Sequence, residues 1–195
     1  HRDPCLRRRR LRRPDAARGG ELGGERAIAG ALAQRPLAAL LPSGRYGRGH
    51  LREHRPNLLA AFPTPVVAAT INATGADDNN GSFTSDGRTL YFSSRRSGAF
   101  EIYKASITTS GEFQAPEAVG ELNAGGIANG NPVISADQLT IYFGRMLQGG
   151  SGDIWMARRS TPADGFGTPV PVTELNTDAT DGPDYLTADG CTLYF

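Results

Sequence analysis

One tetrapeptide recurs three times at a nearly constant interval, and this interval constrains the fold more than the composition does. The pattern is Thr, then Leu or Ile, then Tyr and Phe. It occupies Thr89-Leu90-Tyr91-Phe92, Thr140-Ile141-Tyr142-Phe143 and Thr192-Leu193-Tyr194-Phe195. The closing phenylalanines are 51 and 52 positions apart. A period near fifty residues predicts an array of one repeated supersecondary unit.

Four further markers keep the same phase as the tetrapeptide. They are a Phe-x-x-Pro pattern, an Asn after an apolar residue, an acidic-Ile-aromatic triplet, and an Asp in a turn. They stand at Phe62, Phe113 and Phe166; at Asn72, Asn123 and Asn176; at Ile102 and Ile154; and at Asp86, Asp137 and Asp189. Five markers in phase over three copies exclude coincidence.

The local signals within one repeat are those of strands and turns. In the middle copy, residues 132–135, 139–145, 154–157 and 170–175 have strand composition. Asp-Gly or its counterpart predicts a hairpin with positive φ at both central residues. Gln138 replaces the glycine in the middle copy and should add a little strain. No sustained 3.6-residue period follows residue 62, so each repeat is expected to hold about four antiparallel strands and no helix.

The second strand of each repeat is apolar at three successive positions, as in Leu90-Tyr91-Phe92. Such a strand is covered on both faces. Sheets stacked around an axis, as in a β-propeller, provide this cover. A sandwich strand with a surface Tyr is the alternative, but a fifty-residue repeat fits a sandwich poorly.

These residues resemble the WD40-like β-propeller repeat (the PD40 group) of TolB-related proteins. The resemblance rests on Asp86-Gly87-Arg88-Thr89-Leu90-Tyr91-Phe92-Ser93-Ser94-Arg95, followed by Gly98 and Glu101-Ile102-Tyr103, and it covers residues 62–195. It implies a propeller of six or seven blades, usually outside the cytoplasm, with a binding role. The middle copy departs from the pattern at Gln138 and at Gly144-Arg145-Met146. Sialidase Asp boxes and kelch repeats fit less well.

The predicted fold class is all-β: a partial propeller of about two and a half four-stranded antiparallel blades, preceded by an irregular Arg-rich segment. The two predicted parts are residues 1–61 and residues 62–195. A closed propeller needs roughly four to eight blades. The chain lacks an initiator Met and stops within a predicted strand at Phe195, so we expect a fragment of a longer protein.

The two parts carry opposite charge beneath a net charge of +1. Fourteen arginines and five acidic residues give residues 1–56 a formal charge of +9. Seven basic and fifteen acidic residues give the remainder −8. Three interpretations stay open for residues 1–61: a basic arm for nucleic acid, a transit peptide, or an unstructured or non-native leader. The leader is favoured, because the segment has one Ser and one Tyr and no nucleic-acid motif.

Few side chains in the repeats suggest chemistry. The repeats contain no His, so a Ser-His-Asp triad is excluded there. Cys5 and Cys191 lie in unlike regions, which does not predict a disulfide. Acidic loops precede the first strand of each repeat, at Asp77-Asp78-Asn79-Asn80, Asn129-Gly130-Asn131, and Asp178 with Asp181 and Asp184. Their oxygens would suit calcium, but turn capping is the favoured role, and no metal, cofactor or catalytic residue is predicted.

The sequence leaves two functions open. The first is a non-enzymatic propeller module that binds a protein or glycan partner through its loops, with its ligand residues unknown. The second is an accessory propeller domain of a secreted peptidase or glycan-processing enzyme whose catalytic part lies elsewhere. The resemblance implies a periplasmic or extracellular location. No membrane span is predicted, and nucleic acid is an unlikely partner by composition.

Overall fold

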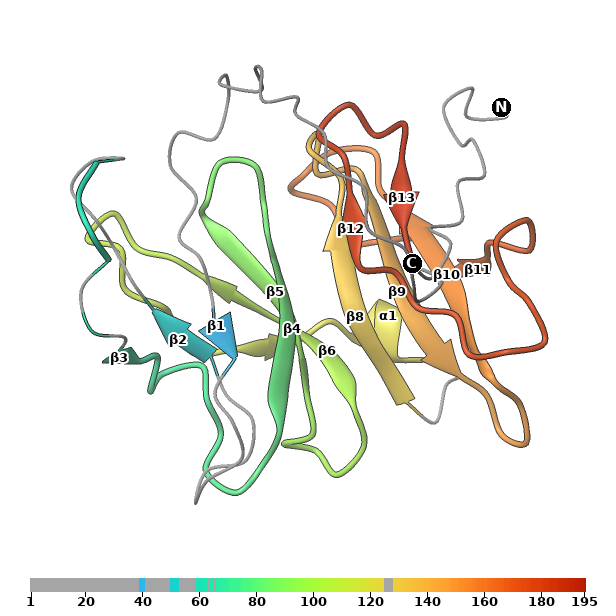
Figure 1. Ribbon diagram of the computed structural model, residues 1–195, viewed down its shortest axis with the longest axis horizontal. Helices are drawn as coiled ribbons and strands as arrows, with labels where there is room; N and C mark the ends of the chain where they lie inside the picture. The colour runs from blue at the N-terminus through green and yellow to red at the C-terminus, as the bar shows by residue number, and fades with distance from the viewer. Residues whose placement is uncertain (1–38, 41–49, 53–58, 63, 65, 125–127) are drawn as a thin grey trace, which may run out of the picture.

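The computed structural model describes residues 39–40, 50–52, 59–62, 64, 66–124 and 128–195 (Figure 1). Within these residues there are thirteen strands and one four-residue helix. In chain order they are β1 Ala39–Leu40, β2 His50–Arg52, β3 Val66–Val67, β4 Asp78–Phe83, β5 Thr89–Ser94, β6 Glu101–Ser106, β7 Glu117–Ala118, α1 Gly120–Asn123, β8 Ala128–Ile134, β9 Thr140–Met146, β10 Gly152–Arg158, β11 Val170–Pro171, β12 Tyr185–Leu186 and β13 Leu193–Tyr194.

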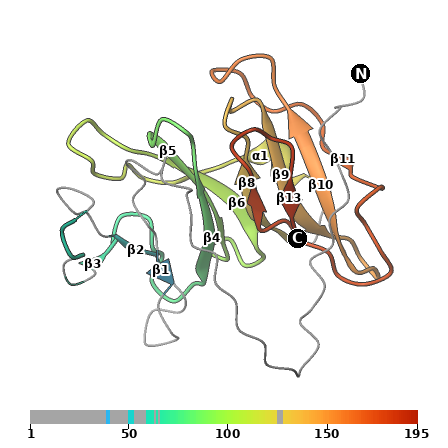
Figure 2. The ribbon, with the colours of Figure 1, turned by 45° about the horizontal axis from the view of Figure 1, so that its top comes forward.

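Strands that are consecutive in the chain are neighbours in each sheet. Two four-stranded antiparallel sheets have the orders β4-β5-β6-β7 and β8-β9-β10-β11. A three-stranded sheet, β1-β2-β3, precedes them, and a two-stranded sheet, β12-β13, follows them. Figures 1 and 2 show the sheets following one another across the molecule, with β4, β8 and β12 at their inner edges. The chain is therefore a partial propeller of successive blades, which confirms the predicted fold class.

The central strand of each blade is buried on both faces, as the sequence predicted. Leu90, Tyr91 and Phe92 are all at most 3% exposed. Leu90 and Phe92 pack toward the preceding sheet, in a cluster with Ile71. Tyr91 points to the opposite face and joins a cluster that includes Phe143 of the next sheet. Alternation along one strand thus divides its apolar side chains between two cores.

Three hydrophobic clusters fill the spaces between successive sheets, and we call them the first, second and third junctions. The first joins the β1–β3 and β4–β7 sheets through Ala68, Ile71, Leu90, Phe92, Tyr103 and Ala105. The second joins the β4–β7 and β8–β11 sheets through Tyr91, Ile102, Val119, Leu122, Ile134, Ile141, Phe143, Ala157 and Phe166. The third joins the β8–β11 and β12–β13 sheets through Val133, Tyr142, Ile154, Val172, Leu175, Leu186 and Leu193.

One asparagine per repeat fastens the end of each blade to its third strand. The amide of Asn123 accepts a hydrogen bond from the N–H of Ile102 at 2.8 Å and donates to the carbonyl of the same residue at 3.0 Å. Asn176 binds Ile154 in the same way, at 2.8 and 3.2 Å. This bidentate contact gives the N–H of each isoleucine a partner and its carbonyl a second donor, beside the N–H of Val119 or Val172.

The same contact at Asn72 extends the repeat into the Arg-rich segment. Asn72 accepts from the N–H of His50 at 2.7 Å and donates to its carbonyl at 2.9 Å. His50, Ile102 and Ile154 are spaced by 52 residues, so β2 occupies the third-strand position of a blade. β1 and β2 both lie within residues 1–61, where the sequence predicted an irregular segment. The division of the chain at residue 61 stays a prediction.

Two local predictions were wrong. The last strand of the middle repeat was expected over residues 170–175 but is only Val170–Pro171. The repeat was also expected to lack helix, whereas Gly120–Asn123 forms one helical turn. This turn buries Leu122 completely and brings Asn123 to Ile102. The segment has no helical periodicity, so the burial of Leu122 and the Asn123 contact stabilise this turn instead of intrinsic propensity.

The hairpin turns also differ from the predicted type. Positive φ occurs at Gly87, Gln138 and Gly190, with values of 69°, 65° and 71°, but not at the preceding Asp residues. The N–H of Gly87 donates to the carbonyl of Thr84 at 2.8 Å, which places the left-handed residue after a β-turn. The expected strain at Gln138 is confirmed, because its left-handed φ disfavours a residue with a Cβ atom.

The two turn positions predict opposite effects on stability. Gly87→Ala should destabilise the protein by about 1 kcal/mol, because left-handed backbone penalises a Cβ atom. No atom lies within 4 Å of a Cβ built at Gly87, so steric contact adds nothing. Gln138→Gly should stabilise it by about 0.5 kcal/mol after the entropic cost of glycine. Chemical denaturation measures both, and shifts of the same sign would contradict this account.

Candidate ligand-binding site

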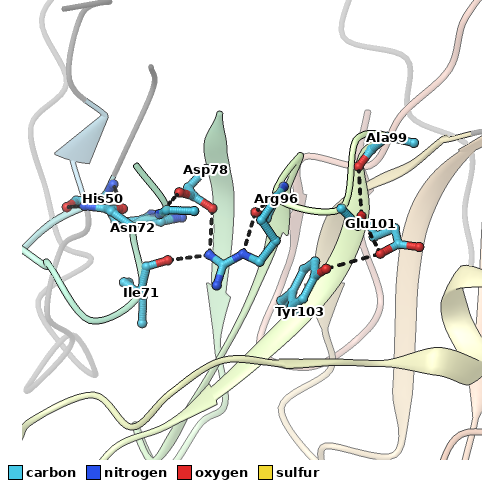
Figure 3. Close-up of polar contacts among 11 residues, drawn as sticks. His50, Ile71, Asn72, Asp78, Arg96, Ala99, Glu101 and Tyr103 are labelled. Atoms are coloured by element: carbon cyan, nitrogen blue, oxygen red, sulfur yellow. Dashed lines mark hydrogen bonds and ion pairs between the residues drawn. The ribbon is translucent and has the colours of Figure 1, made fainter. Parts of the chain in front are cut away.

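The loop residues considered as calcium ligands act mainly as structural caps. Asp78 is fully buried, and its carboxylate pairs with the Arg96 guanidinium at 2.8 Å. The second carboxylate oxygen of Asp78 accepts the N–H of Ala73 at 2.6 Å. Figure 3 shows this network between the segment after β3 and the β4–β7 sheet. Both oxygens of Asp78 are therefore occupied by protein donors.

The equivalent residues of the next two repeats have comparable roles. Asn129 is buried and accepts from the Arg145 Nε at 2.8 Å. Asp181 accepts from the N–H and hydroxyl of Thr177 at 2.6 and 2.8 Å. The Asp181 contact is the turn capping that the sequence favoured, whereas Asn129 binds a side chain of β9. Among the residues that the structure describes, no group of three His, Cys, Asp or Glu side chains is arranged to hold a metal.

Two arginines tie these caps to the aromatic core. The Arg96 guanidinium lies 4.7 Å from the ring centre of Tyr103 and donates to the carbonyl of Ile71. Arg145 lies 4.6 Å from the Trp155 ring and donates to the carbonyl of Leu122 at 2.8 Å. Each arginine thus combines a cation–π contact with hydrogen bonds to a buried polar group and a peptide carbonyl. The sequence did not predict this role, because Arg96 and Arg145 are 49 positions apart and therefore do not follow the period of the repeat.

Removing the Arg145 charge should destabilise the protein strongly. Arg145→Met keeps the length of the side chain but leaves the carbonyl of Leu122 and the Asn129 amide oxygen without this donor. Unsatisfied buried acceptors cost about 2–3 kcal/mol in total. Arg88→Met is the matched control at an exposed position and should change stability by less than about 0.5 kcal/mol. Equal effects in denaturant titrations of the two variants would refute the role assigned to Arg145.

Bulges on the inner strands turn two asparagine side chains toward the inner edge. Asn80 of β4 and Asn131 of β8 have φ values of 50° and 51°, and the strand register shifts at both positions. Asn tolerates left-handed backbone better than most residues with a Cβ atom. The Asn80 amide donates to the Asn131 amide oxygen across the two sheets. The predicted loops 77–80 and 129–131 therefore largely belong to bulged strands.

A cavity of about 300 Å³ lies along these inner strands. Its walls come from three successive sheets: β4, β8, and β12 with its flanking residues. The lining residues are Asn80, Gly81, Ser82, Phe83, Asn131, Pro132, Val133, Ile134, Ala136, Pro183, Asp184, Tyr185, Leu186, Thr187 and Ala188. This volume is at the small end of ligand-binding pockets.

The cavity combines an aromatic ring with polar groups. Tyr185 is 49% exposed, and its ring lies 6.0 Å from that of Tyr194. Asp184 is the one acidic residue among those that line the cavity. Pro183 stands where Asn131 stands one repeat earlier, so the row of asparagines ends at the third sheet. The cavity is therefore asymmetric, with amides at one side and Tyr185 with Asp184 at the other.

Each hairpin turn near the cavity is organised by a hydroxyl and a carboxylate. Ser135 donates to Asp137 at 2.6 Å, and Asp137 also accepts the N–H of Leu139 at 3.0 Å. Thr84 with Asp86 and Thr187 with Asp189 repeat this arrangement. The hydroxyl hydrogen bond, followed by the backbone hydrogen bond, lowers the pKa of all three carboxyls below 3.8. The sequence analysis identified the Asp residues but missed the hydroxyl two positions earlier.

These turns should contribute to acid sensitivity. Because folding lowers their pKa, the carboxylates stabilise the protein above about pH 4, and this stabilisation is lost as the pH falls through their folded pKa values. Asp137→Asn should reduce the loss of melting temperature between pH 6 and pH 2. Ser135→Ala should reduce it similarly, since that hydroxyl is the largest cause of the lowered pKa. An unchanged pH profile in both variants would overturn this interpretation.

The cysteine prediction was wrong for the residue that the structure describes. Cys191 is disulfide-bonded, and Cys5 lies outside the described residues.

Comparisons with known proteins give a likeness in structure but none in sequence. No family model matches the chain, and no curated protein matches it. Among solved structures the chain is similar to TolB from Acinetobacter baumannii, with a TM-score of 0.46 and 17% sequence identity. The match covers 76% of this chain and 31% of that one, so the chain spans about a third of the TolB structure. Membership of the WD40-like group stays a prediction.

The described part of the chain contains no helix that is both long and apolar enough to cross a membrane.

Proposed function

We propose that this chain belongs to a non-enzymatic β-propeller module that binds a protein or glycan partner at the cavity along β4, β8 and β12. The cavity itself carries the proposal, because three successive sheets contribute to it and its lining mixes apolar surface with a few polar groups. Ligand sites commonly have this composition. The amides of Asn80 and Asn131 can donate and accept, and Tyr185 offers an exposed ring.

The architecture suits recognition by a rigid surface. The cavity walls are strands that also contribute to the junctions: Phe83 of β4 packs against the first, Ile134 of β8 belongs to the second, and Leu186 of β12 belongs to the third. Asn80 binds Asn131, and the N–H of Ile134 donates to the Ser82 hydroxyl at 3.2 Å, so neighbouring inner strands are directly joined. A site held in this way loses little entropy when it binds a partner.

The other expectations from the sequence are part of this proposal. We infer a periplasmic or extracellular location, a WD40-like repeat over residues 62–195, and a separate leader over most of residues 1–61. We infer no metal or cofactor. The alternative function is an accessory domain of a secreted peptidase or glycan-processing enzyme, and hydrolase motifs in the adjoining coding sequence would favour it.

Site-directed photo-crosslinking tests the binding proposal. A benzoylphenylalanine at position 185 places the reactive group in the cavity, and the same residue at exposed position 160 is the control. Irradiation of the full chain in an extract of the source cells should give a discrete adduct at position 185 alone. Asn131→Ala should weaken that adduct. Protease or glycosidase digestion of the adduct identifies a protein or a glycan, and equal labelling at both positions would reject the proposed site.

A further inference from the structure

His50 occupies a core position that the next two repeats give to isoleucine. The backbone contacts of Asn72, Asn123 and Asn176 align His50 with Ile102 and Ile154. His50 is 2% exposed, and both isoleucines are fully buried. The first junction therefore contains an ionisable ring where the second and third contain an aliphatic side chain (Figure 3).

The imidazole ring is packed against apolar side chains. It meets the Phe92 ring edge-on, with 5.3 Å between the ring centres. A Cβ atom built at Gly81 would lie 3.3 Å from the His50 Cε1, so β4 approaches the ring closely. The same Cβ atom would lie 2.9 Å from Leu90 of β5. The Nε2 atom is buried and has no hydrogen-bond partner. Burial of such a polar atom is costly, and burial of the same atom with a proton and a charge is more costly.

The charged groups that face His50 from the described elements are already engaged. Asp78 of β4 binds Arg96 and the N–H of Ala73. Arg96, from the segment after β5, also contacts the Phe92 and Tyr103 rings. The segment after β3 presents the Asn72 amide, which binds the His50 backbone. A proton on Nε2 therefore meets no free acceptor; Asp78 attracts its charge, and Arg96 repels it to a smaller extent.

We propose that His50 makes the first junction acid-sensitive, so that its protonation separates the β1–β3 sheet from the β4–β7 sheet while the second and third junctions remain closed. The isoleucines at the equivalent positions cannot take up a proton, which confines the effect to one junction. The separation exposes Leu90 and Phe92 and releases the N–H of Ala73 from the Asp78 carboxylate of β4, a contact that crosses this junction.

The direction of the pH effect follows from burial. Desolvation lowers the pKa of His50 from 6.5 to about 4; Asp78 opposes this shift, and Arg96 adds to it. Because the open state binds a proton more readily, acidification from pH 6.5 toward pH 4 favours opening. Between pH 7 and pH 5 the opening equilibrium should rise on the order of tenfold.

Hydrogen exchange of the full chain provides the test, because the repeats supply internal controls. The N–H of Ala73 donates to the Asp78 carboxylate across the first junction, and the N–H of Thr177 donates to the Asp181 carboxylate at the equivalent place of the third junction. After correction for intrinsic exchange rates, protection at Ala73 should fall on the order of tenfold between pH 7 and pH 5. Protection at Thr177 should stay within about twofold. An equal fall at both amides, or no fall at Ala73, would overturn the proposal.

The substitution His50→Ile gives the first junction the residue of the other two. This variant should abolish the pH-dependent exchange at Ala73 and leave the exchange at Thr177 unchanged. If pH-dependent exchange persists at Ala73, another group is responsible and the proposal fails.

An NMR titration of the His50 ring in the unaltered chain gives a second test that needs no variant. A midpoint near pH 4 to 5 supports a buried neutral ring. A midpoint near 6.5, or a titration in which Ala73 stays protected because Asp78 pairs with the imidazolium, would refute the proposal.

Discussion

Burial of the central strand on both faces is the constraint on which this structure depends. A strand with Leu90, Tyr91 and Phe92 in succession has no face that can meet water without exposing large apolar side chains. Full burial of one such side chain contributes about 1.5–3 kcal/mol, so a sheet placed alone would lose much of its stabilisation. Each sheet therefore needs a neighbour before and after it. The junction between two sheets, rather than the single sheet, is the stable unit.

The asparagine contacts complete this unit at the outer edge. The last strand of a blade is only two residues long at β7 and β11, too short to hold its position by strand pairing alone. Asn123 and Asn176 bind the peptide groups of Ile102 and Ile154 just beyond those strands. The residues just before them, Leu122 and Leu175, lie in the second and third junctions. A single amide thus links the hydrogen bonding within one sheet to the packing between two.

The sequence predicted those parts of the fold that repeat in phase. The strands around Tyr91 and Tyr142, their two buried faces and the strained φ of Gln138 all follow from residue type and spacing. Features that break the phase could not be found in this way. Arg96 and Arg145 reach equivalent aromatic rings from positions that do not align, because a long side chain can approach one site from different points on the backbone.

The bulges at Asn80 and Asn131 were also hidden, for a different reason. Asn next to Asp is typical of a capped loop, and nothing in the residue types distinguishes that loop from a bulged strand. Only the pairing of β4 with β5 reveals the shift in register that directs the amide inward. The cavity was unpredictable for the same reason, since its walls come from three repeats that each satisfy their own strand pairing.

Residue 50 is His, whereas the equivalent residues 102 and 154 are Ile, so equivalent junctions can differ in chemistry. β4 contributes Asp78 to the surroundings of His50, and two residues later it contributes Asn80 to the cavity. Alternate residues of a strand point to the same face, but the left-handed φ of Asn80 breaks that alternation and turns its amide toward β8. The strand that closes the first junction is thus also a wall of the candidate site. If β4 moves away from His50, either the backbone at this bulge changes conformation or the Asn80–Asn131 hydrogen bond changes.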